Sequence, residues 1–277
     1  MTPAPQPQQS QRSRKSQATQ LGRSGLDADG LLVVGEMYGL QLDHLATALA
    51  VADRRVTALV TRWSGAGLAE AGRLGPGPRW VWLTRAGLAA CGLPYTAAAP
   101  ALSRLAHLRA VTAVRLALEA VPQFRAEGAY WRSERRLRSK FGRRLGLREH
   151  LPDGEVHWPD TASVPWAGEC WAIEAELTPK TVSRTSAIMR ELLARTGDYG
   201  DAAFKAGQPR RHTRAIYLCA PAAVPVVTRA RDELGELAAR VEIRFLPASA
   251  AWPDRAGQDR RGRTAAPQVP AVPPENS

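Results

Sequence analysis

The feature that most constrains the fold of this chain is a change of periodicity in its first third, where a helical pattern leads at once into two short apolar runs. One face of the segment 54–63 carries four apolar residues at the i, i+3, i+4, i+7 spacing of an α-helix, Val56, Leu59, Val60 and Trp63. The runs 68–73 and 79–83 then flank the turn LGPGP, which is typical of a β-hairpin. The pattern predicts a helix followed directly by a two-stranded hairpin.

Two further helices are expected before this one. The stretch 31–40 (LLVVGEMYGL) fits a first helix, and 42–49 (LDHLATAL) has apolar residues at helical spacing. Thr84 is placed to cap a short helix after the hairpin. The order of three helices and a two-stranded wing resembles the winged helix-turn-helix family. The segments that carry this resemblance are LDHLATAL, ADRRVTALVTRW, GLAEA and RWVWLTRAGL. We assign this domain to residues 28–98.

The resemblance implies that the third helix enters the major groove of duplex DNA, with its N-terminal side chains at the base edges. The residues that it assigns to the groove are Arg54, Arg55 and Thr57. The residues that it assigns to DNA phosphates are Arg62, Arg73 and Arg79. A winged helix used for protein contact or dimerisation is the alternative, because a fold does not fix a function.

The charge of the chain also indicates nucleic acid as a partner. There are 38 Lys+Arg against 26 Asp+Glu, a formal net charge of +12, and all but four of the bases are arginines, whose guanidinium groups match phosphates bidentately. Residues 1–27, a basic arm, and 251–277, a Pro/Ala/Arg-rich tail, are predicted to be disordered. Between residues 101 and 150 there are 12 basic and four acidic residues. Within that stretch we predict DNA contacts for Arg135, Arg136 and Arg138.

The second half of the chain alternates strands with helices, which predicts an α/β layer domain over 124–250, joined to the first domain by a connecting helix over 99–123. Strands are expected at 155–158, 170–177, 214–219 and 241–246. Helices are expected at 130–141, 178–195 and 224–240, the second of them capped by Thr178. The fold class of the whole chain is therefore α/β, or α+β overall.

A cluster of carboxylates interrupts this basic sequence. Between residues 151 and 203 there are nine acidic and four basic residues, and a hairpin of about seven residues per strand would bring Asp153 beside Glu174. Glu176 shares a strand face with Glu174 because residues i and i+2 point the same way. Acidic clusters are usually solvated surface, but three converging carboxylates also suit Mg²⁺ or Mn²⁺, with Asp153 and Glu174 as the ligands. Such a metal activates water and neutralises charge on a phosphodiester.

The sequences PDG (152–154) and EAE (174–176) resemble the two motifs of the PD-(D/E)xK restriction-endonuclease-like superfamily. Glu176 stands where that superfamily usually has a lysine, a substitution that some members tolerate. The resemblance implies that Lys180 supplies the missing ammonium group, and that Glu134 is the extra acid some members carry on their first helix. The catalytic set that it implies is Asp153, Glu174, Glu176, Lys180 and Glu134.

Over roughly residues 30–250, the combined order resembles the replication-relaxation proteins of actinobacterial plasmids and conjugative elements. This resemblance implies DNA binding at a mobile-element locus. We favour a DNA-binding accessory or regulator of plasmid replication, relaxation or transfer, because Glu176 replaces the usual lysine. The alternative is a magnesium-dependent DNA endonuclease or nickase. Homodimerisation and contacts with other replication or transfer proteins are left open.

Other classes of protein are disfavoured. The three cysteines, at 91, 170 and 219, lack the spacing of a disulfide framework or a zinc knuckle, which favours a reducing cytoplasm. No apolar run is long enough to span a bilayer, so we expect no membrane partner and a cytoplasmic, nucleoid-associated location. The sequence has no Walker A loop, no GxGxxG after a strand and no HExxH.

Overall fold

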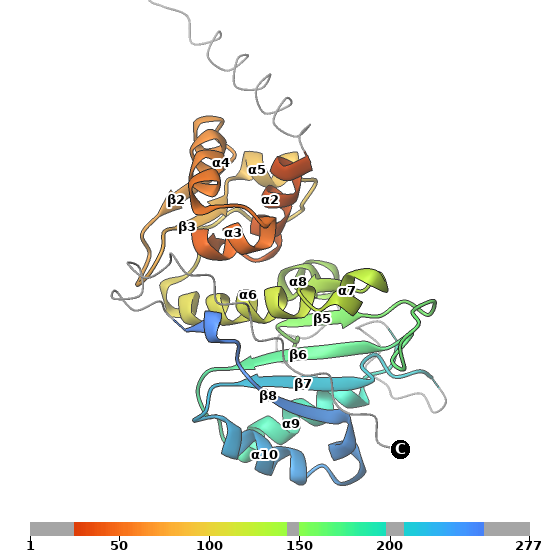
Figure 1. The fold of residues 1–277 in the computed structure, drawn as a ribbon. Helices are drawn as coiled ribbons and strands as arrows, with labels where there is room; N and C mark the ends of the chain where they lie inside the picture. Colours follow the sequence, from red (N-terminus) through yellow and green to blue (C-terminus); the bar gives the residue numbers. More distant parts are fainter. Residues whose placement is uncertain (1–24, 143–149, 198–207, 252–277) are drawn as a thin grey trace, which may run out of the picture. The chain divides into compact units, whose positions relative to one another are not determined.

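The computed structural model describes residues 25–142, 150–197 and 208–251 (Figure 1). Nearly all of the predicted basic arm and C-terminal tail lies outside these residues. Contacts divide the chain into two compact units, Met1–Thr112 with Arg135–Arg143 and Ala113–Glu134 with Arg144–Ser277, which we call unit 1 and unit 2. The fold mixes helices with two sheets, as the sequence predicts.

Unit 1 combines helices with a small antiparallel sheet. Its main elements are α2 (Gly25–Glu36), β1 (Leu40–Gln41), α3 (Leu42–Leu49), α4 (Asp53–Gly65), β2 (Ala69–Gly72), β3 (Trp80–Leu83) and α5 (Arg85–Ala90). Strand β3 lies between β1 and β2 and pairs antiparallel with both. The apolar stripe of α4 is buried and ends at Trp63, and Trp80 of β3 is also in the core. The helix and hairpin predicted from the periodicity are therefore both present.

The first helix differs from its predicted bounds. It begins at Gly25 and ends at Glu36, whereas the apolar stretch suggested 31–40. Tyr38 (φ 63°) and Gly39 (φ 134°) both adopt positive φ angles, which a right-handed helix cannot continue. A Cβ atom on Gly39 would also lie 3.0 Å from the carbonyl oxygen of Val81, so a glycine is required where the chain enters β1.

The predicted helix over 130–141 is wrong in its first third. Residues Tyr130–Ser133 form strand β4, and only Glu134–Phe141 form helix α8. Trp131 and Ser133 alternate as buried residues along β4, and this period of two is characteristic of a strand. The connecting helix α6 (Leu105–Glu119) begins in unit 1 and ends in unit 2, after the short 3₁₀ turn Leu102–Arg104.

Unit 2 is built on one five-stranded mixed sheet in the order β4-β5-β6-β7-β8. Its other elements are α7 (Pro122–Ala126), β5 (Gly154–His157), β6 (Cys170–Glu176), α9 (Val182–Ala194), β7 (Arg214–Cys219), α10 (Val224–Asp232) and β8 (Val241–Phe245). Strands β4, β5 and β6 are antiparallel neighbours, and β6, β7 and β8 run parallel. Helices α9 and α10 cover one face of the sheet (Figure 1). Met189, Leu192 and Tyr217 belong to the buried core on that face.

Two helix boundaries in unit 2 also differ from the prediction. Thr181, not Thr178, caps α9, and its hydroxyl oxygen accepts a hydrogen bond from the backbone N–H of Arg184 at 3.2 Å. Helix α10 ends at Asp232, and the 3₁₀ segment Gly235–Arg240 follows it, starting at a glycine with a φ angle of 60°. Across the three described ranges, no helix is long and apolar enough to cross a bilayer.

Candidate nucleic-acid interface and carboxylate site

Helix α4 presents a basic first turn on the surface of unit 1. Arg54, Arg55 and Thr57 are exposed, whereas Val56 between them is fully buried. Helical spacing explains the contrast, because Val56 lies on the core face and its neighbours do not. Neither guanidinium group makes a hydrogen bond or an ion pair with any residue that the structure describes. Both guanidinium groups are therefore available to a polyanion.

The three arginines predicted to contact phosphates differ in their surroundings. Arg73 and Arg79 are exposed at the two sides of the hairpin turn, and Arg79 also donates a hydrogen bond to a backbone carbonyl of β2 at 3.2 Å. Arg62 instead donates to the carboxylate of Asp27, which is buried and also accepts from the indole N–H of Trp63 at 2.7 Å. The guanidinium group of Arg62 is thus tied to helix α2, with its side chain about half exposed.

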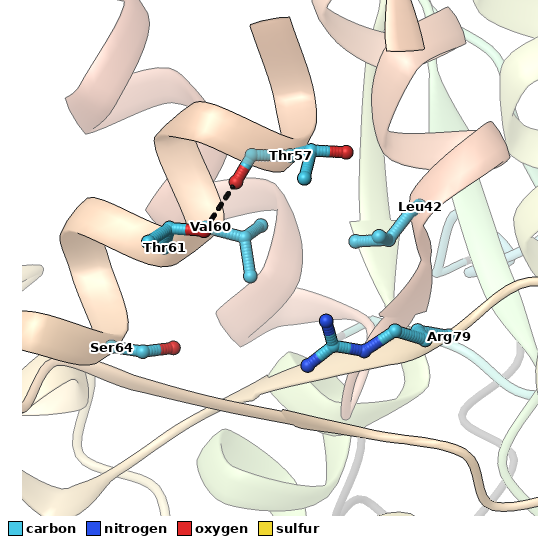
Figure 2. Close-up of a pocket in the computed structure, with 6 residues that line it drawn as sticks. All are labelled: Leu42, Thr57, Val60, Thr61, Ser64 and Arg79. Carbon is cyan, nitrogen blue, oxygen red and sulfur yellow. Dashed lines mark hydrogen bonds between the residues drawn. The ribbon is translucent and has the colours of Figure 1, made fainter. Parts of the chain in front are cut away.

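A pocket of about 220 Å³ lies between α4 and the hairpin (Figure 2). Its lining residues are Leu42, Thr57, Val60, Thr61, Ser64 and Arg79. The hydroxyl groups of Thr57, Thr61 and Ser64 follow one side of the helix, and the guanidinium group of Arg79 reaches in from the hairpin (Figure 2). The Thr61 hydroxyl donates to the carbonyl oxygen of Thr57 at 2.9 Å, which leaves its lone pairs to accept. Hydroxyls beside one cation form a polar recess next to the exposed face of α4.

Arg135 does not fit its predicted role as a DNA contact. Its side chain is buried, and the guanidinium group donates to the carbonyl oxygens of Gly35 (2.6 Å) and Thr96 (2.7 Å). The same group lies over the rings of Tyr38 and Tyr95, 4.7 Å from each centroid. Arg135 is therefore an internal structural cation of unit 1, and we withdraw it from the interface. Arg136 and Arg138, on the same helix, are exposed.

Asp153 and Glu174 lie side by side, as the hairpin length predicts. The ladder between β5 and β6 ends at the pair Gly154 and Ile173, and Asp153 and Glu174 are the next residue on each side. The carboxylate of Asp153 accepts a hydrogen bond from the backbone N–H of Ala175 at 2.9 Å. We call Asp153, Glu174 and Glu176 the carboxylate site.

Glu174 is buried with little compensating positive charge. Its side chain is 2% exposed, and its one hydrogen-bond partner among the described residues is His150, whose Nε2 atom lies 2.7 Å from Oε1. Burial raises the pKa of Glu174 to about 7, His150 opposes that shift, and the neighbouring charge of Asp153 adds to it. Burial alone would lower the pKa of His150, but the contact with Glu174 outweighs it and the net shift is upward.

The other members of the predicted catalytic set lie close by. Glu176 is buried and forms an ion pair with Lys180, which is about one third exposed. Glu134 is next to the site through the backbone, because its N–H donates to the carbonyl oxygen of Asp153 at 3.2 Å. The structure therefore brings Asp153, Glu174, Glu176 and Lys180 to one end of β6, with Glu134 beginning the neighbouring helix.

A second buried carboxylate, Glu155, was not singled out by the sequence. It is fully buried on β5, and it accepts hydrogen bonds from Arg132, His157, Arg211 and His212 at 2.8–3.3 Å. We call these five residues the Glu155 cluster. Burial would raise the pKa of Glu155, but the two histidine contacts and the charge of Arg211 hold it well below its usual value. An acid inside a predicted strand indicates that countercharges exist, but not which residues supply them.

Beside the Glu155 cluster, Cys170 completes a set of three donor atoms with metal-like spacing, in which Glu155, His157 and Cys170 lie within 4.8 Å of one another. Two guanidinium groups already contact Glu155 and would repel a cation there. Burial also raises the pKa of the Cys170 thiol, which disfavours the thiolate that a metal would need. This cluster is charge-balanced by its own residues.

Tyr217 lies next to the carboxylate site and was likewise not foreseen. It pairs with Glu174 in the parallel ladder between β6 and β7, so both side chains lie on the same face of the sheet. The side chain is 1% exposed, and its hydroxyl has no hydrogen-bond partner among the described residues. Nothing in the apolar sequence RAIYLC distinguishes this tyrosine from a core residue.

Comparisons with known proteins add little to this geometry. No protein-family profile and no curated protein matches the chain. Among solved structures, NadR in complex with 4-hydroxyphenylacetate is 16% identical with a TM-score of 0.24, over 32% of this chain and 73% of that one. Ligand-free NadR is 19% identical with a TM-score of 0.23, over 30% and 61% of the two chains. TM-scores this low do not establish a shared fold.

Proposed function

We propose that this chain binds duplex DNA through unit 1, acting as a winged helix-turn-helix with α4 as the recognition helix and the β2–β3 hairpin as the wing. The observation that carries the proposal is the exposed first turn of α4, where Arg54 and Arg55 have no partner among the described residues. Keeping two cations together without a counterion is unfavourable by itself, and a polyanionic partner removes that cost. Neutralised phosphates also release counterions, which drives binding.

The roles of the residues follow from their positions. Arg54, Arg55 and Thr57 would face base edges, because the N-terminal part of a recognition helix is the part that enters the major groove. Arg73 and Arg79 would hold phosphates beside the hairpin, and the pocket of Figure 2 leaves room next to Arg79 for a backbone oxygen. Arg62, which is paired with Asp27, would contribute less.

The salt dependence of DNA binding tests this proposal. We expect the double variant Arg73→Ala, Arg79→Ala to lower the slope of log affinity against log salt by about two, one for each lost phosphate contact. Fluorescence anisotropy of a labelled duplex measures the slope. The matched control is Arg229→Ala, which removes an exposed arginine of α10 in unit 2. A slope that is the same in the double variant and the wild type would reject the phosphate contacts.

The choice of DNA sequence is a separate test. Arg54→Ala and Arg55→Ala are expected to weaken binding to a duplex selected from a random library by roughly tenfold each, because a bidentate contact to a base contributes about 1–3 kcal/mol. Their effect on a random duplex should be smaller. If both duplexes lose affinity equally, these arginines contact only the backbone. A selected site that also occurs at plasmid or conjugative-element loci would support the proposed accessory role in replication, relaxation or transfer.

A second candidate function, metal-dependent cleavage of a DNA strand, is favoured by the carboxylate site. Its residues fit a divalent cation: Glu174 is buried beside the carboxylate of Asp153, and burial raises its pKa to about 7, so an added cation would favour its charged form. Asp153 and Glu174 would hold Mg²⁺ or Mn²⁺, as hard cations prefer carboxylate oxygens. Bound there, the metal would supply an activated water and charge neutralisation at a phosphodiester.

The protein's own residues have definite tasks in that proposal. The Ala175 N–H fixes the orientation of the Asp153 carboxylate. His150, whose Nε2 atom lies 2.7 Å from Glu174, would accept the proton that Glu174 must lose before it can act as a ligand. Lys180, partly exposed beside Glu176, is the ammonium group available to an anionic oxygen of the substrate.

Nicking of supercoiled plasmid in Mg²⁺ or Mn²⁺ tests this candidate. We expect activity in the wild type, none in Asp153→Ala, and full activity in the control Glu169→Gln, whose carboxylate lies outside the site and pairs with Arg214. Equal nicking by the Asp153 variant, or none by the wild type, would reject catalysis and leave DNA binding as the function. Mn²⁺ affinity should rise with pH up to about pH 7, because Glu174 must be deprotonated to bind.

A further inference from the structure

Tyr217 has a buried hydroxyl group at a position where the ring of a phenylalanine would pack equally well. Its ring lies in the apolar core formed with Met189, Leu192 and Ala172, none of which offers a hydrogen bond from its side chain. The hydroxyl oxygen has no partner among the described residues. A buried polar group without a partner is unfavourable, and most such groups in native proteins bind a water, an ion or a ligand.

The position of this hydroxyl points to one ligand environment. Tyr217 is in register with Glu174, on the face of the sheet that also carries Asp153 and Glu176. Burial is the first cause that raises the pKa of Tyr217, and the charges of Glu174, Glu176 and Asp153 raise it further. The hydroxyl group of Tyr217 therefore lies close to the three carboxylates and can form a hydrogen bond with what they bind.

We propose that Tyr217 is a positioning residue of the carboxylate site, whose hydroxyl oxygen accepts a hydrogen bond from a water ligand of the divalent cation bound by Asp153 and Glu174. The inference rests on the proposed cation site. It assigns a partner to the orphan hydroxyl, because a bound divalent cation of the Mg²⁺ class keeps water molecules, and each of these donates hydrogen bonds to acceptors around it.

The inference separates stability from binding. A tyrosine that only fills space would be replaced by phenylalanine without loss of cation affinity. The result differs if the hydroxyl gains its partner only when the cation binds. Tyr217→Phe then removes an unsatisfied polar group from the ligand-free protein and a hydrogen bond from the cation-bound protein. The ligand-free variant should melt at the same temperature as the wild type or up to about 4 °C higher. Its affinity for Mn²⁺ should fall by about 3- to 10-fold.

The experiment is an isothermal titration of Mn²⁺ into the full chain without DNA, with thermal melting of each ligand-free protein. The variants are Tyr217→Phe, Glu174→Gln and the control Tyr130→Phe, in which the altered tyrosine is exposed and its hydroxyl contacts Arg132. We expect Glu174→Gln to abolish binding, Tyr130→Phe to bind like the wild type, and Tyr217→Phe to bind more weakly while melting no lower.

Each contrary result has its own meaning. Equal Mn²⁺ affinity of Tyr217→Phe and the wild type would overturn the inference and leave the cation site standing. A melting temperature of ligand-free Tyr217→Phe well below the wild type would also overturn it, because the hydroxyl would then have a partner inside the protein. Absence of Mn²⁺ binding by the wild type would overturn the cation site and the inference together.

Discussion

Glu155 and Glu174 are two buried glutamates on neighbouring strands of one sheet, and their surroundings are opposite. Both side chains are at most 2% exposed, and Glu155 pairs across the ladder with Ala172, two residues from Glu174 on the same face. Glu155 is contacted by two arginines and two histidines, whereas Glu174 is contacted by one histidine and lies beside another carboxylate. The pKa of Glu155 is accordingly held far below its usual value, while that of Glu174 is raised to about 7.

Burial alone therefore does not determine the role of a buried carboxylate, because the charges around it decide whether it stabilises the fold. The Glu155 cluster satisfies its charge internally, so its carboxylate stabilises the fold. The carboxylate site does not satisfy its charge, so Glu174 is a cost to the fold that a bound cation would remove. Perturbed carboxylates of the second kind gather at functional sites. The following predictions test whether the two glutamates differ in this way.

The largest effect is expected from Glu155→Ala. Removing the carboxylate leaves Arg211 and Arg132 without their shared buried partner. We therefore expect the free energy of unfolding to fall by about 3–5 kcal/mol at pH 7. Urea denaturation measures the change, and Glu169→Ala, which removes a more exposed ion pair with Arg214, should cost about 1 kcal/mol or less. Because the folded-state pKa of Glu155 is lowered, its contribution is present above about pH 4.5 and is lost as the pH falls below that value.

Glu174→Gln should raise the free energy of unfolding at pH 8, whereas Glu155→Ala should lower it. The folded-state pKa of Glu174 is raised from 4.5 to about 7, so its favourable contribution is present below pH 4.5 and is lost as the pH rises through about 7. Glutamine imitates the protonated form and does not lose it. We expect the variant to unfold like the wild type at pH 5 and to be more stable by about 1–3 kcal/mol at pH 8.

The same pair of pH values provides the check on Glu174→Gln. His150 also has a raised pKa, and the stability that it gains from Glu174 is lost over the same rise in pH, so the variant should flatten the pH dependence of the wild type. Melting curves of both proteins at pH 5 and pH 8 measure this. A variant that is less stable than the wild type at pH 8 would remove the contrast between the two glutamates.

The smallest effect is expected from Lys180→Met. Lys180 is about one third exposed, so its ion pair with Glu176 is partly screened by water, and we expect a loss of about 1 kcal/mol. The loss should shrink in high salt, because exposed charges are screened. A loss as large as that of Glu155→Ala would place Glu176 with the internally balanced carboxylates.

Much of the fold and part of the site follow from local patterns. The stripe of α4 and the Pro/Gly turn predict the helix and hairpin of unit 1. The 21-residue separation predicts that Asp153 lies beside Glu174, and these two residues directly follow the pair Gly154 and Ile173 of the ladder. The boundaries failed where a local signal was ambiguous. Residues Tyr130–Ser133 are compatible with a helix until their pairing with β5 is known.

Local sequence patterns therefore predict the order of elements and the types of residue that meet on β5 and β6, because periodicity and turn residues act over a few positions. Which charges are compensated depends instead on the three-dimensional packing. Arg211 is 56 residues from Glu155, and Arg135 is 100 residues from the carbonyl of Gly35 that removes it from the interface. No local pattern contains such pairings, because they arise when strands and loops far apart in the chain pack together, and burial then sets the free energy of each charge.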